Sequence, residues 1–440
     1  GFEGLVLAPE QAALAKAATA AVLSTAGHAF STRTAGFLMQ EHFPPGIDFT
    51  AAGPLHGAQF SGLGCGDVRI PGLAFGLSGD PGGFPLYREG RVIGGVAVEG
   101  DGLYGVDADT FDQEASWEES AALAGASGFD PPPDVRAERI SMEGIRLPYT
   151  NVPLDAAAPV PVEGAFLVAP RAAGPSRFAG LAVGDDQGTT VAGASLRGGG
   201  VLSLAEVSRL VTQALRQAER TRSAVRRPLN SFAHVTVAVV DADGALLGLF
   251  RAADAPVFSA DAAVQAARTA AFFSAPGAGD ALRRAGLAAF AQDVPLDGAV
   301  AYSSRAVGFL AQPYLPPGVP GTDPGPFGVA RPPVWSPFHS GLQSELLCGT
   351  LGAPDRPASP CTAVPGLPNG LALVPGAVPL FKDGRLAGAV GVSGDGPDQN
   401  DLIAAAASVG LEAPPERRSD RVILRGVRLP YLKYPRHPEL

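Results

Sequence analysis

The stretch Arg139-Ile-Ser-Met-Glu-Gly-Ile-Arg-Leu-Pro-Tyr149 decides the fold, because it returns as Arg421-Val-Ile-Leu-Arg-Gly-Val-Arg-Leu-Pro-Tyr431. A second pair keeps the same order, with Pro85-Leu-Tyr-Arg-Glu-Gly-Arg91 returning as Pro379-Leu-Phe-Lys-Asp-Gly-Arg385. Repeats this far apart are not the short units of a solenoid. They predict two tandem copies of one whole domain.

The repeats divide the chain into three parts. Residues 1–150 form a first copy, residues 201–440 form a second and more complete copy, and residues 151–200 form a linker that can add strands. At 440 residues the chain exceeds one ordinary hydrophobic core, which agrees with more than one domain. Residues 313–368 are rich in Pro and Gly, and we expect a long irregular insertion there.

Local patterns in the second copy predict its elements. Apolar residues at helical spacing predict a helix over residues 204–217, with Ser203 and Glu206 as a capping box. Apolar runs predict two strands joined at Asp241-Ala-Asp-Gly244 and a later hairpin that turns at Asp383-Gly384. Further helices are expected over 259–273, 303–312 and 398–409, and a last strand over 421–427. The predicted fold class is therefore α/β (α+β), with an antiparallel sheet flanked by helices in each copy.

The first copy matches the second only from its second helix onward, so its own first helix and hairpin are missing. A sheet without those strands exposes an edge. Three explanations stay open. The missing part is a cleaved N-terminal fragment held non-covalently, which we favour. Alternatively, the apolar stretches 164–170 and 178–196 supply it, or it belongs to a partner chain.

Composition excludes some classes of function. The formal net charge of −10 argues against a nucleic-acid partner. No apolar run reaches the length of a membrane span. No Ser/His/Asp nucleophilic set stands out, so an enzyme is the less favoured interpretation. No signal peptide is visible at Gly1, which leaves a cytoplasmic protein or a processed form.

The order of the motifs resembles that of one known family. Val235-Thr-Val-Ala-Val-Val-Asp241 is followed by Ala267-Arg-Thr-Ala-Ala271, then by Gly388-Ala-Val-Gly-Val-Ser-Gly394 and Asp398-Gln399. This series resembles the GlcG/HbpS-like haem-binding (haem-degrading) family. The resemblance covers residues 202–274 and 371–410, and more weakly 10–40 and 84–125. The Pro-rich insertion departs from the compact domain of that family.

The resemblance implies an α/β domain with one antiparallel sheet and non-covalent binding of haem or a related tetrapyrrole. It also implies a role in iron handling or redox, in the periplasm or outside the cell, and an oligomer. No Cys-x-x-Cys-His occurs, which argues against covalent haem. An alternative from another class is a non-catalytic structural or partner subunit of a larger assembly, with the long loops as contact arms.

Histidine and cysteine pairs supply the ligand candidates. Pro54-Leu-His56 precedes Cys65 at the same spacing at which Pro337-Phe-His339 precedes Cys348. Imidazole and thiolate can ligate haem iron or a transition metal. The alternative is that this tract is kept for packing, with a hydrogen-bonded His and a buried Cys. His42 and Tyr314 take equivalent places in the two copies, and Tyr314 can also ligate iron.

Two further features repeat or pair. Arg33 and Arg305 recur in the two copies and are candidates to clamp the carboxylates of a tetrapyrrole. Alternatively, they form structural ion pairs or lie with their charged ends at the edge of an interface between the copies. Cys348 and Cys361 lie close enough in sequence to form a disulfide across a short Pro-rich loop, if the compartment is oxidising. In that case Cys65 has no partner in the chain.

Overall fold

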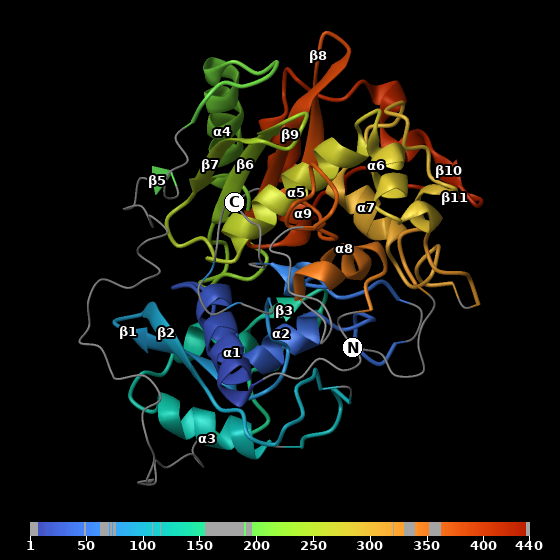
Figure 1. Ribbon diagram of the computed structural model, residues 1–440. Coiled ribbons are helices and arrows are strands. Elements are labelled where there is room, and N and C mark those ends of the chain that lie inside the picture. The colour runs from blue at the N-terminus through green and yellow to red at the C-terminus, as the bar shows by residue number, and fades with distance from the viewer. Residues whose placement is uncertain are drawn as a thin grey trace.

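The computed structural model describes residues 8–47, 50–61, 70, 73, 76–107, 109–114, 116–154, 189–190, 196–319, 321–329, 339–351 and 362–436. Residues 189–190 and 196–436 carry a five-stranded sheet, and residues 8–154 carry a smaller unit below it in the view of Figure 1. We call these two units the second half and the first half. Both contain helices packed on antiparallel strands, so the predicted fold class is confirmed.

The sheet of the second half has the order β5-β7-β6-β9-β8, and all its neighbours are antiparallel. Its strands are β5 (Thr189–Thr190), β6 (Val235–Asp241), β7 (Leu246–Arg251), β8 (Ala377–Lys382) and β9 (Arg385–Gly394). The helices of this half are α4 (Leu204–Ala218), α5 (Ser259–Phe273), α6 (Ala278–Arg284), α7 (Ser304–Leu310), α8 (Leu342–Leu351) and α9 (Pro397–Ala407). The helices predicted over 204–217, 259–273, 303–312 and 398–409 are therefore confirmed.

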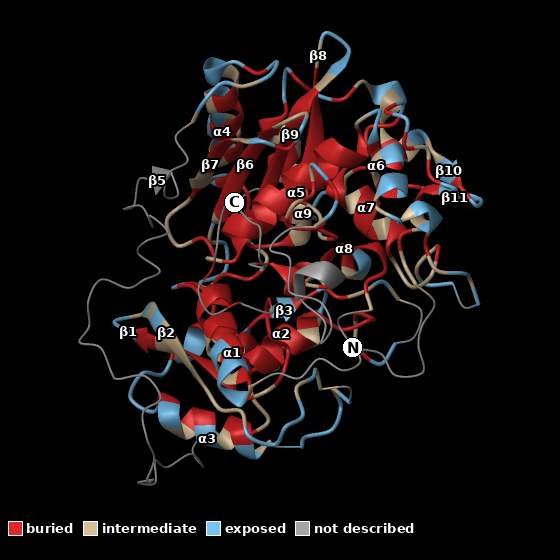
Figure 2. Cartoon of the chain, viewed as in Figure 1, coloured by how far each residue is buried: buried red, intermediate tan, exposed pale blue. Residues whose placement is uncertain are grey.

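The central strand β6 is buried on both faces, and its alternating side chains belong to two different cores. Val235, Val237 and Val239 pack with α4 and α9, whereas Ala238 and Val240 pack with α5. Because α5 is rich in alanine, its backbone can approach the sheet closely, and all of its residues are buried. Figure 2 shows this buried centre as one continuous region through α5, β6 and β9.

The first half is built from α1 (Pro9–Leu23), α2 (Thr32–Leu38), α3 (Trp117–Ala126) and the hairpin β1 (Gly83–Arg88) and β2 (Arg91–Ala97). A short 3-10 helix at Ala58–Phe60 and a small hairpin, β3 (Ser141–Met142) and β4 (Ile145–Arg146), complete it. Both α1 and α3 pack on the β1–β2 hairpin. Within the described residues no third strand pairs with β2, so the predicted open edge is present.

The stretch 178–196 does not close that edge. Its described strand, β5, pairs with β7 of the second half through Thr189–Arg251 and Thr190–Phe250. Of the three explanations for the missing strands, this one therefore fails for the residues that the structure describes. The stretch 164–170 lies outside them.

Matched contacts occur in the two halves. A β-bulge interrupts both hairpins, after Leu86 and after Leu380. The Oγ atom of Ser31 donates to the carbonyl of Tyr149, as that of Ser303 does to the carbonyl of Tyr431. Other matched hydrogen bonds join Ser78 N to Thr19 Oγ1 and Ala372 N to Thr269 Oγ1, and Val98 N to Gly82 O and Val392 N to Gly376 O. These pairs support the tandem repeat, which stays a prediction, as do its domain boundaries.

A shared core joins the halves. Val225, Phe258 and Ala262 of the second half belong to the same apolar cluster as Val22 and Leu38 of the first. Hydrogen bonds run alongside it, from Arg227 N to Gly27 O (2.8 Å) and from Ala26 N to Asp254 Oδ1 (2.9 Å). We call this junction the seam.

Two predicted elements need correction. The Pro-rich stretch 313–368 contains a helix, α8, whose Leu342 and Leu346 lie one turn apart and pack into the core with Phe273 and Phe327. The expected strand 421–427 is a small hairpin, β10 (Ile423–Leu424) and β11 (Val427–Arg428), because the chain turns between them at Arg425-Gly426 with positive φ. In the described part of the chain, no helix combines the length and the apolar character needed to span a membrane.

Candidate functional site

Three of the residues predicted as ligands come together near the seam. The ring of His42 stacks on the ring of Tyr314, with centroids 5.9 Å apart and planes 21° apart. His56 lies close enough for the charge of His42 to influence its pKa. The structure thus joins a first-half histidine with the second-half tyrosine that takes the equivalent place in sequence. We call His42, His56 and Tyr314 the histidine cluster.

The backbone after α2 positions both histidines. The helix begins at a capping box made by Ser31 and Thr34 and ends at Leu38. The chain then folds back on itself, with Gly53 N donating to Gln40 O and Leu55 N to Leu38 O, both at 2.9 Å. A left-handed turn at Gly57 (φ 88°) follows, which favours glycine. His42 and His56 therefore stand on the two sides of one folded loop.

The hydrogen bonds of the two imidazoles leave one nitrogen of each without a partner. His42 Nδ1 donates to Thr50 O at 2.9 Å, and His42 Nε2 is buried without a hydrogen-bond partner. His56 bonds the carbonyl of Met39, and its buried Nδ1 has no partner. An N–H that donates to a backbone carbonyl fixes the tautomer and leaves a lone pair on the other nitrogen. This is the arrangement usual for a histidine that ligates a metal.

Burial keeps His56 uncharged. It lowers the pKa of His56 to about 4, and the nearby His42 acts in the same direction. A neutral imidazole needs to lose no proton before it donates its lone pair. One acidic side chain borders the cluster, since Glu41 Oε2 lies 3.9 Å from His42 Nε2 and both residues are buried.

An apolar cavity of about 60 Å³ lies beside the cluster, at the seam. Pro54, Leu55 and Ala58, which flank His56, form part of its wall, and Phe258 and Val374 come from the second half. His28 also lines it, but both ring nitrogens are engaged, Nε2 with Leu23 O (2.9 Å) and Nδ1 with Thr25 Oγ1 (3.1 Å). His28 therefore has no lone pair free for a ligand.

The other predicted metal ligands are placed differently or lie outside the described residues. The bond from His56 N to Gly53 O matches the bond from Gly328 N to Gly325 O, so in backbone hydrogen bonding His56 corresponds to Gly328 and not to His339. His339 lies shortly before α8 and is half-buried. Cys65, Cys361 and the side chain of Cys348 lie outside the described residues, as does the predicted Cys348–Cys361 disulfide.

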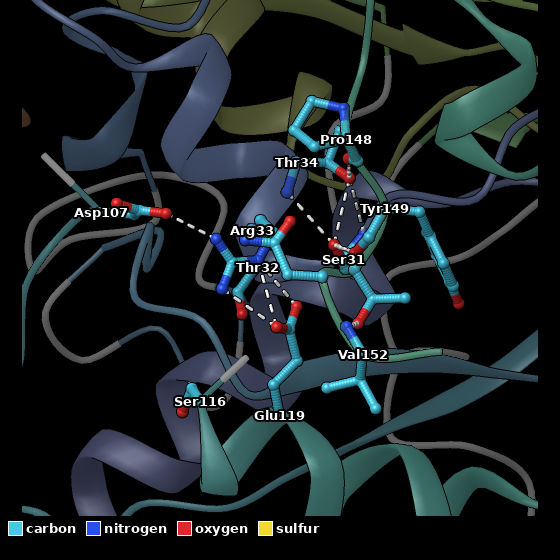
Figure 3. Close-up of polar contacts among 12 residues, drawn as sticks. Ser31, Thr32, Arg33, Thr34, Asp107, Ser116, Glu119, Pro148, Tyr149 and Val152 are labelled. Carbon is cyan, nitrogen blue, oxygen red and sulfur yellow. Dashed lines mark hydrogen bonds and ion pairs between the residues drawn. The ribbon is translucent and has the colours of Figure 1, made fainter. Parts of the chain in front are cut away.

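Arg33 and Arg305 each form ion pairs within their own half. Arg33 contacts Glu119 through Nε (2.9 Å) and Nη2 (3.0 Å), and its Nη1 contacts Asp107 (2.5 Å), as Figure 3 shows. Arg305 contacts Asp398 (2.6 Å) and the fully buried Asp401. These contacts are those expected from the structural alternative, and a role in clamping tetrapyrrole carboxylates stays a prediction.

Sequence reasoning missed a second polar group, in the first half. The ammonium group of Lys16 is fully buried and contacts Asp80, Glu99 and Glu118. Among the described residues, these carboxylates are the only set of three His, Cys, Asp or Glu side chains whose ligand atoms lie within 4.8 Å of one another. The four residues come from separate segments, so no local motif marks them. The lysine itself was the available signal, because it interrupts an alanine-rich helix.

The structure is thus an α/β fold with helices packed on antiparallel strands, and its candidate site is the buried histidine cluster. Comparison with protein families is more specific: residues 344–408 match the family described as haem degrading protein HbpS-like. The resemblance stated from the motifs is thereby confirmed for this segment, which spans β8, β9 and α9.

Several solved structures are similar to part of the chain. They are protein ORFY of Klebsiella pneumoniae (18% identity, 47% of this chain and 87% of that chain, TM-score 0.26), the PduOC–haem complex (18%, 48% and 97%, 0.25) and a double mutant of HbpS from Streptomyces reticuli (18%, 50% and 93%, 0.23). No protein of curated function matches.

Proposed function

We propose that this protein binds haem or a related tetrapyrrole non-covalently, in iron handling or redox outside the cytoplasm. The observation that carries the proposal is the pair of buried imidazoles, His42 and His56, each with one nitrogen held by a backbone carbonyl and the other without a partner. The match of residues 344–408 to a haem-degrading family supports the class of ligand.

The donor set fits iron. A neutral imidazole nitrogen is a common axial ligand of haem, and bound haem would supply a redox-active iron. His42 Nε2 and His56 Nδ1 are the atoms able to ligate it, and the carbonyls of Thr50 and Met39 would hold the rings in place. The flat ring of Tyr314 offers a stacking surface beside His42. The cavity of about 60 Å³ does not hold a tetrapyrrole, so the loops carrying His42 and Tyr314 must separate on binding.

A haem titration of the purified chain tests the proposal. We expect a Soret band that saturates with haem and shifts or weakens in His56→Ala and His42→Ala. The matched control is His234→Ala, because the half-buried His234 is likewise bonded to a backbone carbonyl, that of Ala253, but is not part of the histidine cluster. Circular dichroism verifies that the variants fold. A band of equal strength in all three variants, or no band in the wild type, contradicts the proposal.

The predicted metal pairs are tested in the same preparations. If His56 and Cys65, or His339 and Cys348, hold a transition metal, elemental analysis finds metal that His56→Ala or His339→Ala removes. Metal that survives both substitutions excludes these pairs as the site.

A second candidate function, a non-catalytic partner subunit, is favoured by the edge of β2. Strand β9, which has the equivalent hairpin position, pairs with β6 along seven residues, whereas β2 pairs only with β1 among the described residues. An unpaired strand edge is a site at which another strand can add. Light scattering and mass spectrometry of the isolated particle test this. A pure, colourless monomer without a second chain or a cleaved fragment contradicts it.

A further inference from the structure

The starting observation is the ion cluster around Lys16 in the first half. Glu99 Oε2 and Glu118 Oε2 each lie 2.7 Å from Lys16 Nζ, Asp80 Oδ2 is also in contact, and Val98 O accepts a further hydrogen bond at 3.1 Å. Burial alone disfavours the ammonium form, but the carboxylates, Asp80 most strongly, outweigh burial and raise the pKa of Lys16. Lys16 therefore fills this place as a permanent cation.

The matched contacts of the two halves locate the same place in the second half. The hydrogen bond from Ser78 N to Thr19 Oγ1 matches the one from Ala372 N to Thr269 Oγ1. Their acceptors align Lys16 with Ala266, and their donors align Asp80 with Val374. The bonds of Val98 and Val392 align Glu99 with Ser393. The ion pairs of Arg33 with Glu119 and of Arg305 with Asp401 align Glu118 with Asn400. The second half thus replaces all four charged residues by uncharged ones.

In the second half this place is a cavity instead of an ion cluster. Val374, Ser393 and Asn400 all line the apolar cavity of about 60 Å³ described above. Asn400 is only 6% exposed, and its Oδ1 has no hydrogen-bond partner. A buried acceptor without a partner costs free energy, and a ligand that donates to it removes this cost.

We propose that the second half binds a small uncharged molecule, or the small uncharged end of a larger one, which donates a hydrogen bond to Asn400 Oδ1. In the first half the side chain of Lys16 closes the equivalent site. This inference does not rest on the proposed binding of haem.

The walls select against charge. None of the aligned positions of the second half carries a charge, and the adjacent Asp395 is already paired with Arg226, which also contacts Asp254. A charged ligand would lose its hydration without gaining a partner. Apart from His28, whose ring nitrogens are both engaged, the remaining side chains of the lining are apolar and include Leu23, Phe30 and Phe258, so the body of the ligand is apolar too.

The volume limits the size of the group. A cavity of roughly 150 Å³ holds benzene. Scaled from the six non-hydrogen atoms of benzene, a cavity of about 60 Å³ suits about two to three non-hydrogen atoms, the size of ethanol.

Three probes of nearly equal size separate the contributions of hydrogen bonding and charge. Ethanol donates a hydrogen bond, acetonitrile only accepts one, and formate carries a charge. Saturation-transfer NMR on the full chain is expected to show ethanol binding about five-fold more tightly than acetonitrile, the effect of one buried hydrogen bond, and formate not binding. Equal signals from ethanol and acetonitrile in the wild type overturn the proposal, as does the absence of any signal.

Two variants verify the place of binding. Asn400→Leu removes the acceptor, so acetonitrile should then bind at least as well as ethanol. Val374→Phe fills the cavity and should abolish both signals. This variant also serves as the control for non-specific contact with the probes. An ethanol signal that persists in Val374→Phe, with folding shown by circular dichroism, overturns the proposal. If either variant fails to fold, the comparison of the three probes on the wild type still tests the proposal.

Discussion

Replacing Lys16 by Met should destabilise the first half strongly. Methionine has a similar length but no charge, so the substitution leaves Asp80, Glu99 and Glu118 facing one another without their cation. Removing one partner of a buried ion pair typically costs about 3–5 kcal/mol, because the remaining charge is buried and uncompensated. Since whole domains are stable by only about 5–15 kcal/mol, this loss is easily measured.

The loss should depend on pH in a defined direction. Burial raises the pKa of Asp80 to about 7 even with Lys16 in place, and without Lys16 the pKa of Asp80 rises further, because the charge of Lys16 lowers it. A carboxyl whose pKa is higher in the folded than in the unfolded state binds protons more tightly when folded. Its charged form therefore destabilises the fold above the unfolded pKa, near 4, and the variant should regain stability as the pH falls from 7 towards 4. Each additional proton that the folded state binds changes the free energy of unfolding by about 1.4 kcal/mol per pH unit.

Denaturant unfolding of the wild type and the variant, at several pH values between 4 and 7, measures this difference. Lys382→Met is the matched control, because Lys382 Nζ lies 2.9 Å from Glu206 but its side chain is 33% exposed. A pair at the surface contributes at most about 1 kcal/mol. A Lys16→Met protein as stable as the Lys382→Met control, or a loss that stays constant with pH, refutes the reasoning.

Other substitutions test the histidines, the close helix contacts and the buried ion pairs. Burial lowers the pKa of His28 to about 4 from 6.5, so folded stability should fall by about 3 kcal/mol between pH 6.5 and pH 4, and His28→Gln should flatten that fall in denaturant series. In Gly36→Ala and Gly308→Ala the new methyl group would lie 2.2 Å and 2.0 Å from a backbone carbonyl, so each should lower stability by about 1–3 kcal/mol, whereas Gly94→Ala, with no atom within 4 Å, should change it little. Arg305→Met leaves the buried carboxylate of Asp401 unpaired and should lower the free energy of unfolding by about 3–5 kcal/mol in the same assay. A loss smaller than that of an exposed ion pair contradicts the structural role of Arg305.

Sequence reasoning succeeded where the signal is local. The helix α4 was predicted to within one residue because its capping box, Ser203 with Glu206, and its apolar spacing lie in one short stretch. The turn at Asp383-Gly384 was predictable because both residues adopt positive φ, which Asp and especially Gly tolerate. The helix α8 was missed because proline and glycine around it outweighed the short apolar spacing of Leu342 and Leu346.

The candidate site was only partly predictable for the opposite reason. The sequence indicates His42, His56 and Tyr314 as donors, but their meeting depends on a contact between segments more than 250 residues apart. The tautomers depend on backbone carbonyls, which no side-chain pattern reveals. The four residues of the ion cluster likewise come from distant segments, and three of them are ordinary acidic residues in sequence.

The seam has a consequence for how this protein can evolve. Val225, Phe258 and Ala262 of the second half complete the core of the first half. Neither half can therefore be exchanged on its own. A recombination event that transplants residues 8–154 alone would leave an unfilled apolar surface, with the hydrogen-bond partners of Ala26 and Gly27 left behind. A viable exchange has to carry residues 224–262 with it, so its breakpoints cannot fall at the ends of the two predicted copies.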